Sequence, residues 1–180
     1  MAQQDVKLVQ GLTRFEASLE GGALEGRARI FRDGAPYAQM QFAKGQLNGP
    51  TTLLHSPGRP SAQLHYQDGQ LHGPCRFLAP DGTLQRQAGY HKGQLHGELK
   101  NYHPDGGLAE QASYRQGRLH GLHQRFHPNG KLAQRQHYQH GLPVGEPERF
   151  DEKGQPLGPD GKPQGRWRRW WQKLLGVPAE

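Results

Sequence analysis

The sequence is short of cysteine and of long apolar runs. Cys75 is the only cysteine among the 180 residues, so no disulfide can form within the chain, and a reducing compartment is expected. No stretch approaches the roughly 20 apolar residues that a transmembrane helix needs. The first residues also lack the basic and then apolar pattern of a secretory signal. These absences predict a soluble, cytoplasmic protein.

Apolar residues are scarce as well. They make up 32% of the chain, whereas there are 26 glycines and 14 prolines. So few apolar side chains cannot fill a thick core, and they would indicate disorder if they were scattered at random. The 23 Lys and Arg against 16 Asp and Glu give a formal charge of +7. A basic surface favours acidic partners, but it does not distinguish an acidic protein from anionic lipid or nucleic acid.

The apolar residues recur with a period of 24 residues. The pattern Gly-x-Leu-x-Gly occupies 45–49, 69–73, 93–97 and 117–121. A further glycine recurs midway through each unit, and an aromatic residue stands three positions before each of these turns: Gly34, Gly58, Gly82, Gly106, Gly130 and Gly154, and Phe42, Tyr66, Tyr90, Tyr114 and Tyr138. Such regular spacing indicates a repeat architecture.

Each repeat is expected to contain two short β-strands. Asp-Gly and Asn-Gly pairs mark hairpin turns, because these residues accept the positive φ that tight turns require. Between the turns, alternation places Leu108, Ala112 and Tyr114 on one face of a strand together with Glu110, and no helical stripe fits this pattern. The sequence therefore predicts an all-β fold, an elongated single-sheet antiparallel meander of about six 24-residue hairpin repeats.

The chain divides into three segments. Residues 1–19 are expected to form an N-terminal lead-in or cap, residues 20–158 the hairpin repeats, and residues 159–180 a basic, tryptophan-rich segment with a short amphipathic helix. Three roles remain open for that helix: capping the open end of the sheet, docking to a protein partner, or contacting a membrane. The candidate partner-binding residues are Trp167, Arg168, Arg169, Trp170, Trp171, Leu174 and Leu175.

A hairpin unit with an aromatic residue ahead of Gly-x-x-x-Gly resembles the MORN repeat, and the resemblance covers about residues 20–158. The Asp/Asn-Gly turn and the 24-residue step are most similar to the bacterial YwqK-type antitoxin subgroup. This resemblance implies a scaffold that binds proteins or, in some members, acidic lipids. For the subgroup it implies an antitoxin or immunity protein that neutralises a toxin. The sequence departs from the pattern at Pro143, where the repeat leucine is lost.

No set of residues predicts catalysis or a cofactor. His72, His96 and His120 recur at one turn position, but residues 24 apart lie two strands apart. They are therefore separated by roughly 10 Å, too far to share one metal ion. Cys75 aligns with Thr51 of another repeat and has no recognisable base and orienting group. No enzyme activity, metal or cofactor is expected.

The predicted function is protein binding by a non-catalytic repeat scaffold, in the form of an antitoxin or immunity protein that occludes a cognate toxin. The alternative is a peripheral membrane scaffold that binds anionic lipid through its basic surface and its C-terminal helix. Nucleic acid is a less favoured partner, because the aromatic rows are better explained as the ridge of side chains that holds the sheet together.

Overall fold

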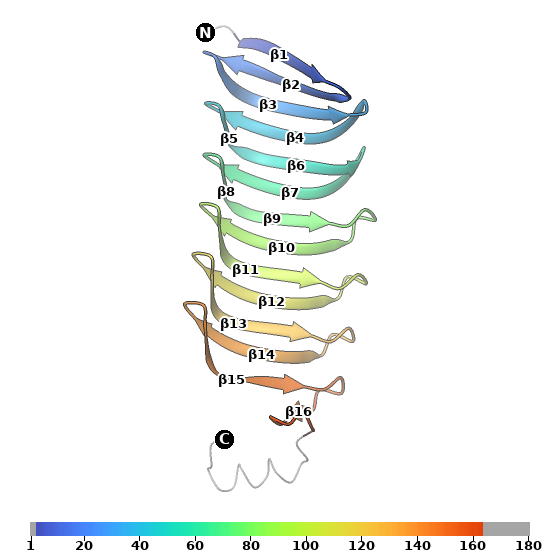
Figure 1. Ribbon diagram of the computed structural model, residues 1–180, viewed down its shortest axis with the longest axis vertical. Coiled ribbons are helices and arrows are strands. Elements are labelled where there is room, and N and C mark those ends of the chain that lie inside the picture. Colours follow the sequence, from blue (N-terminus) through green and yellow to red (C-terminus); the bar gives the residue numbers. More distant parts are fainter. Residues whose placement is uncertain (1–2, 164–180) are drawn as a thin grey trace.

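The computed structural model describes residues 3–163, which form one open antiparallel sheet (Figure 1). The sixteen strands pair in chain order, except that β5 and β8 pair only with β4 and β7. The predicted all-β meander is confirmed, whereas the predicted C-terminal helix lies outside the described residues. Within them, no helix is long and apolar enough to cross a membrane. The strands are β1 Gln3–Gln10, β2 Thr13–Glu20, β3 Ala23–Arg32, β4 Ala35–Ala43, β5 Gln46–Leu47, β6 Gly49–Ser56, β7 Arg59–Gln67, β8 Gln70–Leu71, β9 Gly73–Leu78, β10 Leu84–His91, β11 Gln94–Tyr102, β12 Leu108–Arg115, β13 Arg118–Phe126, β14 Leu132–Gln139, β15 Leu142–Phe150 and β16 Pro156–Leu157.

The Gly-x-Leu-x-Gly segments lie at the strand ends along one side of the sheet, which we call the turn edge. Each segment makes a tight turn followed by a β-bulge. Lys92 and Gly93 have φ values of 49° and 76°, the left-handed pair that a type I′ hairpin turn requires. Beyond the turn, the pairing register of β10 and β11 shifts next to Gly89. A Cβ added to Gly89 would lie 2.3 Å from the backbone oxygen of His96, so this bulge excludes any larger residue there.

The turns at the opposite edge change type halfway along the chain. In the first half, two-residue turns such as Asp33-Gly34 join directly paired strand ends. From β9 onward, the turns are longer and are closed by a hydrogen bond between residues three apart. The Gly106 amide, for example, donates to the His103 carbonyl oxygen at 2.9 Å. The Asp105 carboxylate also accepts a bond from the Gly107 amide at 2.9 Å. These are type I turns with a glycine bulge, which explains the Pro-Asp-Gly signature.

The core is a row of small residues on one face of this single layer, called the inner face below. Cys75 and Ala88 are fully buried, and Ala112 is 1% exposed. Because no second layer of secondary structure covers the sheet among the described residues, larger neighbours on the same face must close over this row. The strands in Figure 1 bow along their length, which brings those neighbours together.

The first and last units of the sheet both continue the strand pairing, but they differ in how well they bury apolar side chains. Residues 1–19, assigned as a lead-in or cap, contribute β1 and most of β2, which continue the same antiparallel sheet. At the other end, β15 still pairs with β14 across the turn that contains Pro143. Leu142 and Val144 of that unit remain largely exposed, in keeping with its lost leucine.

Candidate binding face

One row of directly opposed residues on the inner face runs from β1 to β15, and we call it the cross-strand ladder. Opposed residues in antiparallel strands share a face and lie close enough for their side chains to interact. In order, its members are Leu8, Phe15, Ile30, Ala38, Leu53, Ala62, Phe77, Arg86, Asn101, Glu110, Arg125, Gln134 and Arg149.

The first half of the ladder, from β1 to β9, is entirely apolar. Phe15, Ile30, Leu53 and Phe77 are each half-buried, which leaves part of every side chain accessible on the inner face. A run of partly exposed apolar side chains on a bent, uncovered sheet is typical of a surface that another molecule covers.

The second half of the ladder is polar and hydrogen-bonded across the strands. Arg86 Nε donates to Asn101 Oδ1 at 2.8 Å, and Asn101 Nδ2 donates to Glu110 Oε2 at 2.6 Å. His123 Nε2 lies 2.6 Å from the other carboxylate oxygen of Glu110, and Arg125 Nε lies 3.8 Å from it. The network spans β10 to β13 and centres on one carboxylate.

Glu110 is the electrostatic centre of this half. Burial by itself would raise the pKa of Glu110, but hydrogen bonds from Asn101 and His123 and the charges of His123 and Arg125 bring the pKa below its usual value. The carboxylate therefore stays ionised. Arg125 lies on the adjacent strand, and Arg86 and Arg149 stand further along the same ladder, two and three strands away. Their exposed guanidinium groups suit carboxylates of a partner.

The outer face of the sheet carries a polar row that does not change character. Lys7, Glu16, Arg29, Gln39, Thr52, Gln63, Arg76, Gln87, Lys100, Gln111, Gln124, Arg135 and Glu148 oppose one another in sequence. Its ion pairs are local, as where Arg135 forms a two-bond contact with Glu148 at 2.9 and 2.7 Å. This face also carries apolar residues two positions further along the same strands, as Leu78 follows Arg76 and Phe126 follows Gln124. Leu78 pairs with Leu84 of the next strand, so these residues pack within a hairpin.

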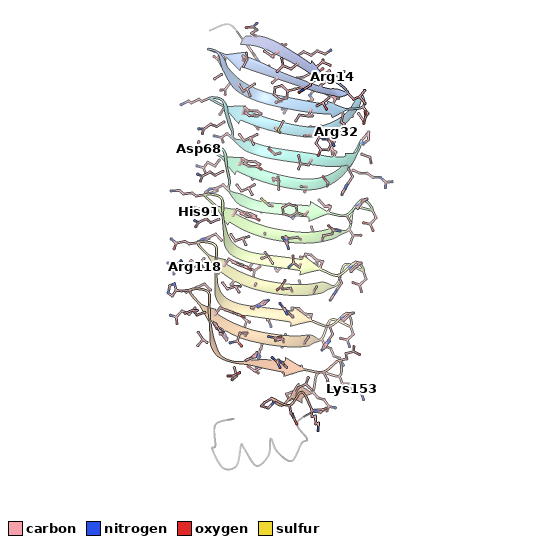
Figure 2. The ribbon with its side chains drawn as sticks, viewed as in Figure 1. Arg14, Arg32, Asp68, His91, Arg118 and Lys153 are labelled. Atoms are coloured by element: carbon pink, nitrogen blue, oxygen red, sulfur yellow. The ribbon has the colours of Figure 1, made fainter. Side chains whose placement is uncertain are left out.

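Histidines gather on the turn edge, where Figure 2 labels Asp68, His91 and Arg118. The His91 ring lies between His72 and His96, with centroid distances of 4.8 and 5.6 Å. Burial lowers the pKa of His91, and the charges of His72, His96 and Lys92 lower it further. Among residues 3–163, no group of three or more His, Cys, Asp or Glu side chains could hold a metal ion.

At the edge opposite the turn edge, a second set of histidines forms hydrogen bonds between neighbouring repeats. The Nε2 atoms of His55, His103 and His127 lie 3.0, 3.3 and 2.9 Å from the backbone oxygens of the residues 23 positions later. This role was not predicted from the sequence, because the acceptor is a backbone atom of the next repeat. The distance of 23 residues from each histidine to the last residue of a later strand is the signal that could have revealed it.

Cys75 lies where the repeat alignment put it, in the buried row with Thr51 and Leu99. Burial raises the pKa of its thiol above the usual value, whereas a reactive thiolate is exposed and has a lowered pKa. The candidate partner-binding residues between Trp167 and Leu175 lie outside the described residues, so the structure places none of them.

This architecture defines a class of protein, the single-layer β-hairpin repeat scaffold. A family model described as a MORN repeat variant matches two adjacent repeats, at residues 95–116 and 119–140. The match does not extend to the YwqK-type antitoxin subgroup. No curated protein matches the chain. A crystal structure of TarM aligns with a TM-score of 0.26 and 10% identity, over 73% of this chain and 19% of that one, and this likeness carries no functional argument.

Proposed function

We propose that the chain is a non-catalytic scaffold that binds a protein partner on its inner face. The observation that carries this proposal is the uncovered cross-strand ladder, which is apolar from Leu8 to Phe77 and polar, with three arginines, from Arg86 to Arg149. A partner with an apolar patch beside an acidic patch would match both halves. Two MORN repeats within the chain support a binding role over a catalytic one.

In its specific form, the proposal is an antitoxin or immunity protein that occludes a cognate toxin. The support for this form is the sequence resemblance to the YwqK-type subgroup. Steric blockage of the toxin's active site would be a sufficient mechanism, because a long sheet can cover a cleft without any cofactor. The partner's inhibition, rather than its capture alone, is the property that separates an antitoxin from another scaffold.

The experiment is a capture from lysate of the source cells with the full chain and four variants as bait. Phe77→Ala and Arg125→Ala change the inner face, and Arg76→Ala and Gln124→Ala change the outer face one residue away on the same strands. We expect one partner that both inner-face variants lose and both outer-face variants retain. The side chain of Arg125 is 60% exposed, so its loss should not unfold the sheet, and melting curves verify this for all four variants.

Two other results would count against the proposal. Equal loss of the partner from inner and outer variants would place the contact elsewhere on the molecule. Recovery of anionic lipid instead of protein would favour the membrane scaffold. If a protein is captured but its activity is unchanged when bound, the antitoxin form fails and the scaffold form stands.

A further inference from the structure

The two ends of the sheet differ in how their edge strands are protected. At the C-terminal end of the described residues, β16 has only two residues, one of them Pro156, and Leu157 forms a single bridge with Pro163. A short strand and a proline are the usual devices that stop a sheet edge from pairing further. At the N-terminal end, β1 has eight residues without proline, and its pairing with β2 shows no register shift.

The free side of β1 presents a regular set of backbone groups. Gln10 and Thr13 flank a two-residue turn, so they form a hydrogen-bonded pair in which both residues face each other. Because this orientation alternates along the strand, the even-numbered residues of β1 bond to β2. Their odd-numbered neighbours point N–H and C=O groups away from the sheet: Gln3, Asp5, Lys7 and Val9. Among the described residues, β1 has no partner on that side.

We propose that β1 is a self-association edge at which two copies of the chain pair β1 with β1 in antiparallel orientation. A two-fold axis perpendicular to the sheet would produce this pairing and would keep the two inner faces on the same side. Leu8 and Val9, which are 61% and 66% exposed, would then lie beside a neighbouring strand.

The charges of β1 select one register. With Val6 opposite Val6 of the second copy, Asp5 of each copy faces Lys7 of the other, and all four outward-facing residues find hydrogen-bonding partners. A shift by two residues in either direction would oppose Asp5 to Asp5 or Lys7 to Lys7 and leave one outward-facing residue unpaired. Opposed like charges on adjacent strands are destabilising, so only the first register is self-complementary.

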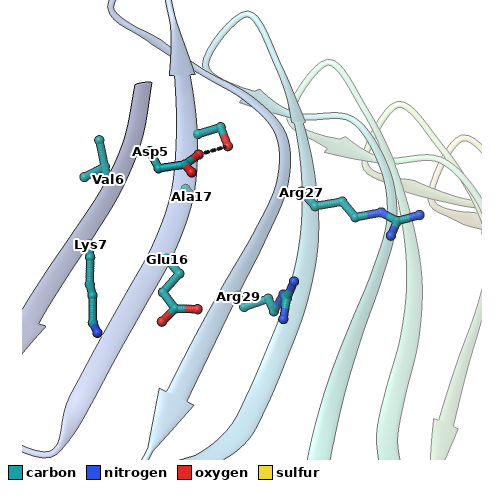
Figure 3. Close-up of a pocket in the computed structure, with 8 residues that line it drawn as sticks. Asp5, Val6, Lys7, Glu16, Ala17, Arg27 and Arg29 are labelled. Carbon is teal, nitrogen blue, oxygen red and sulfur yellow. Dashed lines mark hydrogen bonds between the residues drawn. The ribbon is translucent and has the colours of Figure 1, made fainter. Parts of the chain in front are cut away.

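Both charged side chains lie on the outer face and are free to reach across the axis. Figure 3 shows Asp5 and Lys7 on β1, beside Glu16 of β2. Asp5 Oδ1 accepts one bond from Ser18 Oγ at 2.8 Å, which orients the carboxylate and leaves its second oxygen available. Lys7 is opposed within the chain by Glu16. Pairing along one strand buries less than a standard interface of about 1,600 Å², so a concentration-dependent dimer is expected.

The test is sedimentation velocity of the full chain from about 5 to about 500 µM, the range in which such an edge contact should associate. Lys7→Asp and Asp5→Lys should each weaken the dimer at least about tenfold, because each replaces two attractive pairs with two repulsive ones. An equimolar mixture of the two variants should dimerise again, since unlike charges then face each other. Lys92→Asp, an equal charge change at a distant turn, should have no effect.

The register has its own test by cysteine cross-linking. Val6→Cys should form an interchain disulfide under mild oxidation, because a non-hydrogen-bonded pair brings the two Cα atoms to about 4.5 Å. Leu8→Cys should not, since the two positions would lie about 14 Å apart along the strands, and native Cys75 is buried. A monomer at every concentration, unchanged association of the charge variants, or equal cross-linking of both cysteine variants would overturn the proposal.

Discussion

The two halves of the inner face fill the same ladder positions with opposite chemistry. From β1 to β9 the ladder consists of opposed apolar pairs such as Phe15 with Ile30 and Ala62 with Phe77. From β10 to β13 it is a hydrogen-bonded network around Glu110. The turn that joins β9 to β10, closed by the bond from Gly82 N to the Ala79 oxygen, is also the first of the second type. The strands nevertheless pair in the same chain order in both halves, so the repeat sheet does not depend on the chemistry of the ladder. Its glycine turns and its row of aromatic residues set the geometry, which leaves the ladder free to vary.

The largest expected effect is in the apolar half. Phe77→Ala should lower the free energy of unfolding by about 2 kcal/mol, since it removes a half-buried aromatic side chain that neighbours cannot replace. Urea denaturation measures the change. Arg76→Ala, one residue away on the outer face, should cost less than about 0.5 kcal/mol. Equal costs would mean that the two faces do not differ in packing.

The polar half should be most sensitive at Glu110. Glu110→Ala should lower the free energy of unfolding by about 1.5 kcal/mol, because Asn101 and His123 lose a shared acceptor. As a matched control, Glu98→Ala removes an exposed outer-face carboxylate and should cost less than about 0.5 kcal/mol. If both substitutions had equally small effects on the free energy of unfolding, the network would not contribute to the stability of the sheet.

A stabilising change is expected in the apolar half. The hydroxyl of Thr51 is buried and has no hydrogen-bond partner in the part of the chain that the structure describes. Thr51→Val keeps the shape and removes this unpaired group, so it should raise the free energy of unfolding by about 1 kcal/mol. Thr52→Val on the outer face is the control and should be close to neutral. A destabilised Thr51→Val protein would show that the hydroxyl does bond.

The smallest effect is a pH dependence confined to the polar half. The pKa of Glu110 is lowered in the folded state, so its contribution is complete above the unfolded value of about 4.3. It disappears as the pH falls through the lower folded value. The difference in unfolding free energy between the native chain and Glu110→Gln should therefore shrink as the pH falls from about 5 towards 3. A difference that grows over this range would contradict the sign of the shift.

The sequence was sufficient for the meander, the strand periodicity and the placement of Glu110 with Ala112 and Tyr114 on one face. The prediction that Leu108 shares this face was wrong, because a register shift puts Leu108 opposite Tyr102 rather than in step with Glu110. It was not sufficient for the ladder. The bulge after each Gly-x-Leu-x-Gly turn changes the register between adjacent strands, and this shift decides that Arg86 opposes Asn101. Alternation within one strand carries no information about that offset, so the polar network could not be assembled from the repeats alone.

The measurement that tests the account most directly is the affinity of the recovered partner for single-residue variants of each face, determined by titration calorimetry at two salt concentrations. Phe77→Ala and Arg125→Ala should each weaken binding at least about tenfold, and salt should reduce the native affinity but have less effect on Arg125→Ala. Arg76→Ala and Gln124→Ala should bind like the native chain. If the outer-face variants lost the partner and the inner-face variants kept it, the inner face would not be the binding surface.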